Sequence, residues 1–106
     1  MATGTLGQAA LAATTNTTVY TVPATTFTVL SFTVVNRGTS TASVRVALAS
    51  SATPASAEYI EYDAQISPGG TLERTGIIMN AGKLLVCYAS NANISVSAFG
   101  IETSTV

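Results

Sequence analysis

The sequence predicts an all-β protein, an antiparallel β-sandwich of about eight strands with an immunoglobulin-like or jelly-roll-like arrangement. Three observations support this fold class. Thr, Val, Ser, Ala and Ile dominate the chain of 106 residues, and β-branched side chains favour pleated strands. Turn signals recur at roughly 8–12-residue spacing, as in sandwiches and barrels. The only segment with good helix propensity, Leu6 to Ala13, is too short to form a stable helix alone.

The expected strands lie between these turn signals. The segments 27–36 and 43–50 alternate apolar and polar residues and flank a turn at Gly38, which predicts that they pair as a hairpin. Segment 83–90 is apolar at both odd and even positions, which point to opposite faces of a strand. We therefore expect a central strand that is covered on both sides. The full set of expected strand segments comprises one within residues 5–12, then 17–22, 27–36, 43–50, 58–63, a short strand around 64–66, 71–79, 83–90 and 94–102.

A chain of this length forms one domain. We expect residues 17–106 to make the single sandwich domain. Residues 1–16 are expected to form an N-terminal arm that orders only on assembly, by adding a strand to a neighbouring subunit. The alternation along the strands predicts a core shared between two packed sheets, made of Leu30, Phe32, Val34, Val44, Val46, Leu48, Ile78, Leu84, Val86, Ile94 and Val96.

Charged residues are unusually few. They make up 8% of the chain, against 47% hydrophobic residues, whereas about a quarter of the positions in a typical soluble domain are charged. The four basic residues are scattered, which argues against nucleic-acid binding. No segment approaches the ~20 apolar residues of a membrane span. We therefore expect no nucleic-acid or membrane partner, and we expect part of the apolar surface to be covered in a homo-oligomer or by a larger scaffold.

The residues needed for common catalytic chemistry are missing. The chain has no histidine, which excludes Ser/His/Asp and Cys/His nucleophile arrangements and histidine-based zinc sites. We expect no enzyme activity, catalytic residue, cofactor or metal. The single cysteine, Cys87, lies within a strand-like run and is expected to be a buried, apolar core residue.

The run "EYIEYD" (Glu58 to Asp63) concentrates acids and tyrosines. On a regular strand Glu61 and Asp63 would share one face, as charges that protect a sheet edge. A glycosidase-like carboxylate pair and a calcium site built from Glu58, Glu61 and Asp63 are the alternatives. Tyr59 and Tyr62 would fall on opposite faces of a regular strand, which argues against a carbohydrate-stacking platform made of tyrosines. The expected interface residues are Tyr59, Ile60 and Tyr62, at a sheet edge or subunit contact. Tyr20 and Tyr88 are expected in or near the core.

Two stretches carry a family resemblance. "VYTVPATTFTVLSFTVVNRG" (residues 19–38) and "YIEYDAQISPGGTLERTGIIMNAGKLLVCYASNANISVSAFGIE" (residues 59–102) resemble small virion structural proteins of tailed bacteriophages. The resemblance covers roughly residues 17–102. It implies a capsid decoration or cement protein, a compact and often trimeric β-sandwich that binds the major capsid protein on the outer shell. It would be made in the bacterial cytoplasm and reside on the virion surface. The resemblance supplies no catalytic residues.

Other roles fit the same sequence. A head–tail connector, a tail accessory protein or a tail-fibre subunit would differ mainly in copy number and ring symmetry. A glycan- or receptor-binding β-sandwich module would present exposed aromatic residues in its loops.

Overall fold

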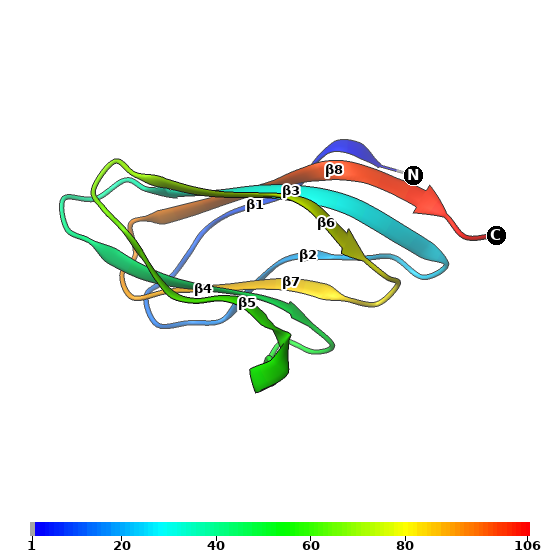
Figure 1. Ribbon diagram of the computed structural model, residues 1–106, viewed down its shortest axis with the longest axis horizontal. Helices are drawn as coiled ribbons and strands as arrows, with labels where there is room; N and C mark the ends of the chain where they lie inside the picture. The colour runs from blue at the N-terminus through cyan, green and yellow to red at the C-terminus, as the bar shows by residue number, and fades with distance from the viewer. Residues whose placement is uncertain (1) are drawn as a thin grey trace.

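Two four-stranded antiparallel sheets stack face to face in the computed structural model, which describes residues 2–106 (Figure 1). Sheet A has the order β1 (Thr3–Ala10), β8 (Ile94–Ser104), β3 (Thr26–Asn36) and β6 (Thr71–Met79). Sheet B has the order β2 (Thr17–Thr21), β7 (Leu84–Ala89), β4 (Ala42–Ala49) and β5 (Tyr59–Ile66), with a short 3₁₀ helix η1 (Ser56–Glu58) before β5. The predicted all-β antiparallel sandwich is confirmed.

The strand pairing is nested. β4 pairs with β5, β3 with β6, β2 with β7 and β1 with β8, all antiparallel. Additional pairing of β3 with β8 and of β4 with β7 rolls this ribbon into two sheets. An antiparallel ribbon rolled in this way is a jelly roll, one of the double-sheet solutions to the problem of exposed strand edges. Of the two arrangements left open by the sequence, the topology matches the jelly roll.

The predicted hairpin between residues 27–36 and 43–50 is wrong. These segments form β3 and β4, which lie in opposite sheets, so the turn between them is a crossover. Asn36 anchors this crossover: its side-chain amide donates to the carbonyls of Ser40 (2.8 Å) and Ile66 (3.0 Å) and its oxygen accepts from the Gly38 N–H (2.9 Å). Alternation of apolar and polar residues predicts only that each strand has one buried face. That face is buried in a sandwich whether the next strand along the chain lies in the same sheet or in the opposite one.

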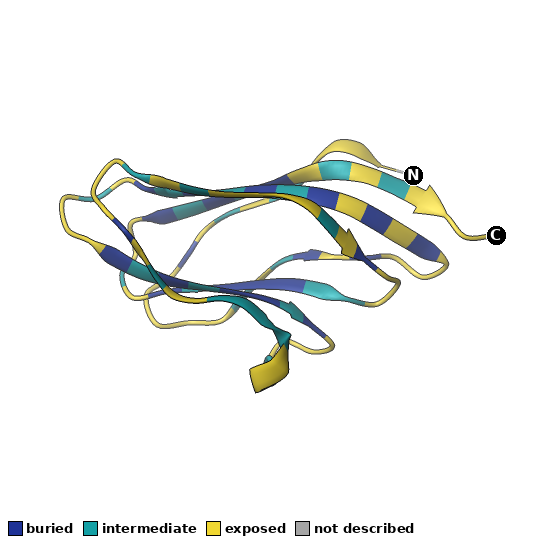
Figure 2. Cartoon of the chain, in the orientation of Figure 1, coloured by how far each residue is buried: buried dark blue, intermediate teal, exposed yellow. Residues whose placement is uncertain are grey.

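The inward faces of both sheets form the core (Figure 2). The core prediction is confirmed for Leu30, Phe32, Val34, Val44, Val46, Ile94 and Val96, which are all buried in one cluster. Leu48 and Leu84 are only half-buried, and Val86 is buried in a second cluster with Ala47 and Ala49, on the outer side of sheet B. The buried Cys87 confirms its predicted core position.

The predicted burial of Ile78 is wrong, because its side chain is 71% exposed. A β-bulge is the cause. Between the paired positions Phe32–Arg74 and Leu30–Ile77, β6 contains one residue more than β3. Gly76 lies within this bulge with φ +70°, a conformation that glycine adopts without strain. The extra residue reverses the alternation, so that Ile77 and Met79 point inward and Ile78 points out.

The N-terminal segment lies along the sandwich. Thr3–Ala10 forms β1 and pairs with β8 of the same chain from Thr3↔Ile101 to Ala10↔Ser95. Residues 3–10 are therefore part of sheet A within the single chain, and β1 occupies one edge of that sheet. That this pairing forms only on assembly, or with a neighbouring subunit, stays a prediction.

Candidate functional site

Sheet A exposes an apolar patch on its outer face. Val29 on β3 lies directly between Ile78 on β6 and Ile101 on β8, and these three side chains are 41%, 71% and 54% exposed. Phe27 and Phe99, two residues along their strands, extend the patch. Figure 2 shows this exposure as a striped pattern along one half of β3 and β8. Alternation explains the arrangement, because residues two apart on one strand and residues directly paired on neighbouring strands share a face. We call these five residues the apolar patch.

The residues beside the apolar patch in the register are uncharged. They are Thr3 opposite Ile101, Thr5 opposite Phe99, Ser31 opposite Phe99 and Thr103 opposite Phe27. The charged residues Arg37 and Glu73 lie toward the other end of sheet A, where Arg37 donates to the Ser95 hydroxyl at 2.7 Å and Glu73 pairs with Thr33. Hydroxyl groups therefore supply the polarity beside the patch on β1, β3 and β8, whereas Glu58 and Lys83 line a hollow together with Ile78 at the β6 edge.

The area of this face is close to that of a specific interface. β3 and β8 contain 11 residues each. With ~3.3 Å per residue and ~4.8 Å between strands, a four-stranded face of this length covers about 700 Å². A standard interface buries roughly 800 Å² on each partner. The outer face of sheet A can therefore form a whole interface with little help from other elements.

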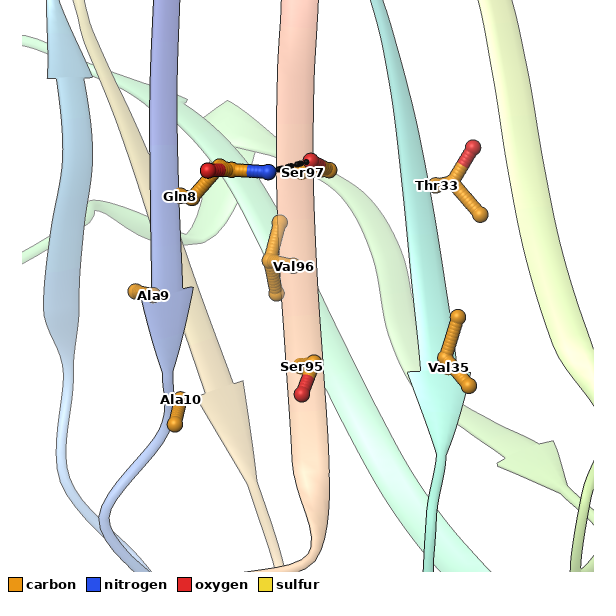
Figure 3. A pocket seen from close by; sticks show the side chains of 8 residues that line it. All are labelled: Gln8, Ala9, Ala10, Thr33, Val35, Ser95, Val96 and Ser97. Atoms are coloured by element: carbon orange, nitrogen blue, oxygen red, sulfur yellow. Dashed lines mark hydrogen bonds between the residues drawn. The ribbon is translucent and has the colours of Figure 1, made fainter.

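The other half of the same face holds a shallow groove lined by small apolar and polar side chains (Figure 3). Its volume is about 460 Å³. Gln8 on β1 donates from its side-chain amide to the Ser97 hydroxyl on β8 at 2.8 Å, so these polar groups satisfy one another. The groove is lined by Gln8, Ala9, Ala10, Thr33, Val35, Ser95, Val96 and Ser97. None of these residues is charged, and the set offers no general acid or base.

The prediction that segment 83–90 forms a central strand covered on both sides is confirmed for β7 (Leu84–Ala89), although Leu84 and Tyr88 are only half-buried. β7 lies between β2 and β4 in sheet B, and residues 85–87 are buried. Its outer side is covered by the chain itself, because Tyr59 and Leu84 pack against Val86, Ala47 and Ala49. The exposed apolar side chains of Phe27, Val29, Ile78, Phe99 and Ile101 therefore lie on sheet A rather than over β7.

The prediction that Glu61 and Asp63 share a face is wrong. Register shifts in the β4–β5 pairing and a left-handed Asp63 (φ +53°) separate them. Glu61 is opposite the core residue Val46 and reaches across the sandwich to Arg74 on β6, whose Nε donates at 2.6 Å. Asp63 points outward and accepts from Arg45 Nε at 2.7 Å. Two carboxylates with separate arginine partners do not form a glycosidase pair.

The Glu58 carboxylate also has its own partners. It accepts from the backbone N–H of Ala55 (2.8 Å) and from both the N–H and hydroxyl of Ser50 (3.0 Å each), with Lys83 Nζ at 3.6 Å. These contacts, the Ala55 bond first, lower the pKa of Glu58, and the Arg45 hydrogen bond lowers the pKa of Asp63. Glu58, Glu61 and Asp63 do not converge. In the described part of the chain, no three His, Cys, Asp or Glu side chains gather closely enough to hold a metal ion.

The three residues expected at an interface differ in exposure. Tyr62 is 60% exposed, Tyr59 is half-buried, and Ile60 packs against the core. The prediction that the tyrosines lie on opposite faces is wrong, because their rings meet edge to face with centroids 5.1 Å apart. Their interface role stays a prediction. Tyr20 is buried as expected, whereas Tyr88 lies on the outer side of sheet B beneath the Arg45 guanidinium.

Sequence reasoning missed a polar contact that joins the two sheets. The Tyr20 hydroxyl on β2 donates to the Glu102 carboxylate on β8 at 2.5 Å and lies 2.8 Å from the Thr28 hydroxyl on β3. Burial and the Glu102 bond raise the pKa of Tyr20 to about 12, and the same bond lowers the pKa of Glu102. Burial likewise raises the pKa of the Cys87 thiol to about 12, so this thiol is unsuited to nucleophilic chemistry.

Comparison of the chain with protein-family models, with curated proteins and with solved structures found no match. The class defined by the fold is an all-β sandwich whose most distinct surface is the apolar patch of sheet A. Among residues 2–106, no helix has the length and apolar character needed to cross a membrane.

Proposed function

We propose that this chain is a non-enzymatic virion structural protein, a capsid decoration or cement protein that binds the outer shell of a tailed bacteriophage through the outer face of sheet A. The observation that carries the proposal is the apolar patch formed by Phe27, Val29, Ile78, Phe99 and Ile101. Solitary proteins rarely leave such a patch uncovered without a functional reason. The sequence resemblance supplies the kind of partner, the major capsid protein.

The physical properties of the face suit a subunit that is present in many copies. Hydroxyl groups around the apolar patch can make hydrogen bonds without the desolvation cost of buried charges. The contact is then independent of the electrostatic field of the packaged genome. Many modest contacts repeated over a shell add up through multivalency. Jelly rolls also build viral capsid domains, although a shared architecture is an analogy and does not by itself establish a function.

The proposal includes a homo-oligomer, with a trimer favoured by the resemblance. In this arrangement the subunits contact one another outside the apolar patch, which stays available for the shell. Analytical ultracentrifugation of the purified chain measures the oligomeric state before any shell is added. Self-association that disappears when Ile78 is changed to serine would instead make the apolar patch a contact between copies.

Counting copies of the chain in purified particles tests the proposed function. The family resemblance implies hundreds of copies for a decoration protein, which occupies repeated shell positions, and about a dozen copies or fewer for a connector, tail accessory or fibre subunit, which forms rings or appendages. Quantitative mass spectrometry against the major capsid protein measures this ratio. Absence from the particles would refute a virion role, and a count of about a dozen would favour a connector or tail subunit.

A further inference from the structure

We propose that the outer side of sheet B carries a second site, a carbohydrate-binding hollow built around Tyr62. The hollow has a volume of about 510 Å³ and is lined by Pro54, Ser56, Tyr59 and Tyr62. Its size lies within the range of small-molecule sites and accommodates one or two sugar rings. The inference does not depend on the proposed virion role.

Tyr62 is exposed but held firmly in place. The Arg45 guanidinium lies 4.3 Å from its ring centroid and 4.7 Å from the ring centroid of Tyr88. Asp63 fixes this guanidinium through hydrogen bonds from Nε (2.7 Å) and Nη2 (3.3 Å). Tyr59 meets Tyr62 edge to face at an interplanar angle of 85°. An aromatic side chain that is already ordered loses little conformational entropy when a partner binds.

The local backbone is irregular where these side chains are placed. The β4–β5 pairing shifts register between Val44 and Val46 and again between Val46 and Ala47. Asp63 has a left-handed φ of +53°, which is uncommon for a residue other than glycine. Bulges of this kind redirect side chains and are frequent beside binding sites. Here the irregularity brings Tyr59 and Tyr62, which a regular strand would place on opposite faces, to one corner.

The chemistry of the hollow fits a neutral ring that has an apolar face and polar edges. The lining residues are uncharged, and the nearby charges are paired as Arg45–Asp63 and Lys83–Glu58. A charged ligand would therefore find no counter-ion. The tyrosine and proline rings offer flat apolar surface, and the hydroxyls of Ser56, Tyr59 and Tyr62 can each donate and accept hydrogen bonds. A pyranose presents the complementary features, C–H groups on one face and hydroxyls around its edge.

A proline-rich peptide is the competing occupant and fits less well. Polyproline II segments repeat every three residues, about 9 Å, and bind in successive aromatic clefts. The hollow provides a single aromatic corner, which matches one ring rather than a repeating helix. In Figure 1 the η1 segment beside the hollow lies below the lower layer, whereas sheet A forms the upper layer. The hollow and the outer face of sheet A therefore belong to different layers of the sandwich.

The experiment measures binding of the purified chain to an immobilised panel of simple saccharides and bacterial surface polysaccharides, with a proline-rich decapeptide as a comparison probe. We expect at least one carbohydrate to bind. Tyr62→Ala should weaken that binding at least about tenfold, and Ser56→Trp, which fills the hollow and leaves Tyr62 in place, should weaken it similarly. Val106→Ser replaces an exposed apolar side chain that belongs neither to the hollow nor to the apolar patch; it is the control and should bind as the wild type does.

Three outcomes would overturn the proposal. They are a panel with no carbohydrate bound, carbohydrate binding that is unchanged in both hollow variants, and Tyr62-dependent binding of the peptide alone. Circular dichroism and thermal unfolding verify that each variant is folded. Because Ser56→Trp leaves the Arg45–Tyr62 contact intact, the proposal stays testable even if Tyr62→Ala disturbs the fold. No virion particle is used, so failure here is distinguishable from failure of the proposed decoration role.

Discussion

Replacing Tyr20 with phenylalanine tests the polar contact that joins the two sheets. The substitution keeps the ring in the core and removes only the hydroxyl that contacts Glu102 (2.5 Å) and Thr28 (2.8 Å). A hydrogen bond to a charged group contributes about 1.5–3 kcal/mol, and an unsatisfied buried hydroxyl costs about 1–3 kcal/mol. Thr28 is fully buried, whereas solvent can replace the lost partner of Glu102. We therefore expect Tyr20→Phe to lower the free energy of unfolding at pH 7 by roughly 1–2 kcal/mol.

The alkaline pH dependence gives an independent test of the same contact. The pKa of Tyr20 is raised to about 12 in the folded chain, whereas an unfolded tyrosine titrates near 10. Between about pH 10 and pH 12 the unfolded state therefore binds fewer protons than the folded state, and stability falls as the pH rises. Phenylalanine cannot titrate, so the stability difference between wild type and Tyr20→Phe should shrink across this interval. Cys87 also titrates late, but it contributes equally to both proteins and cancels in the difference.

Urea denaturation from pH 7 to pH 12, followed by circular dichroism, measures both effects. At pH 7 the variant should also show a lower Tm, by about 4–8 °C per kcal/mol for a domain of this size. Equal stability of the two proteins at pH 7 would refute the account of the contact. A stability difference that stays constant up to pH 12 would refute the raised pKa of Tyr20.

Two further predictions concern the core. Phe32→Ala should lower the free energy of unfolding by about 3–5 kcal/mol, because Phe32 is fully buried in the main cluster; urea denaturation measures the loss, and a cost below about 1 kcal/mol would show that this site is not tightly packed. Cys87 should react with a thiol reagent such as DTNB only as fast as the chain unfolds, because its thiol is buried and its pKa is raised to about 12; rapid reaction of the folded protein at pH 8 would contradict its placement.

The strands could be predicted from the sequence, because β-branched alternation and turn residues are local signals, whereas the short helix η1 (Ser56–Glu58) was not predicted. The pairing of strands was less accessible. The hairpin expected between residues 27–36 and 43–50 is instead a crossover, because the nested pairing that defines a jelly roll depends on contacts between segments far apart in the chain. A turn at Gly38 serves either arrangement.

Bulges explain most of the other errors. One extra residue at Gly76 reverses the alternation of β6 and exposes Ile78. Irregular pairing in β5 separates Glu61 from Asp63 and joins Tyr59 to Tyr62. A bulge depends on how two strands pair, so the sequence of one strand alone does not reveal it. The glycine inside β6, Gly76, was nevertheless a signal for a bulge, because a glycine within a strand often marks one.

The apolar patch could have been recognised from the sequence in part. Residues 27–30 and 98–101 are apolar at nearly all odd and even positions. This pattern indicates strand segments with two apolar faces. The pattern cannot show whether the second face is covered by the same chain, as it is over β7, or is left exposed, as it is on sheet A. The fold of the whole chain decides between these two outcomes.

Occupancy of virion shells by a sheet A variant tests the central claim most directly. Ile78→Ser combined with Ile101→Ser removes the two most exposed side chains of the apolar patch. Thr18→Ala, at an exposed position on β2 of the other sheet, is the control. Each folded protein is incubated with shells that lack the chain, and the copies retained after sedimentation are counted. We predict that the double variant retains at most about a tenth of the wild-type copies, a loss of ~1.4 kcal/mol or more, while the control retains all of them. Equal retention of the double variant and the wild type would contradict docking through sheet A.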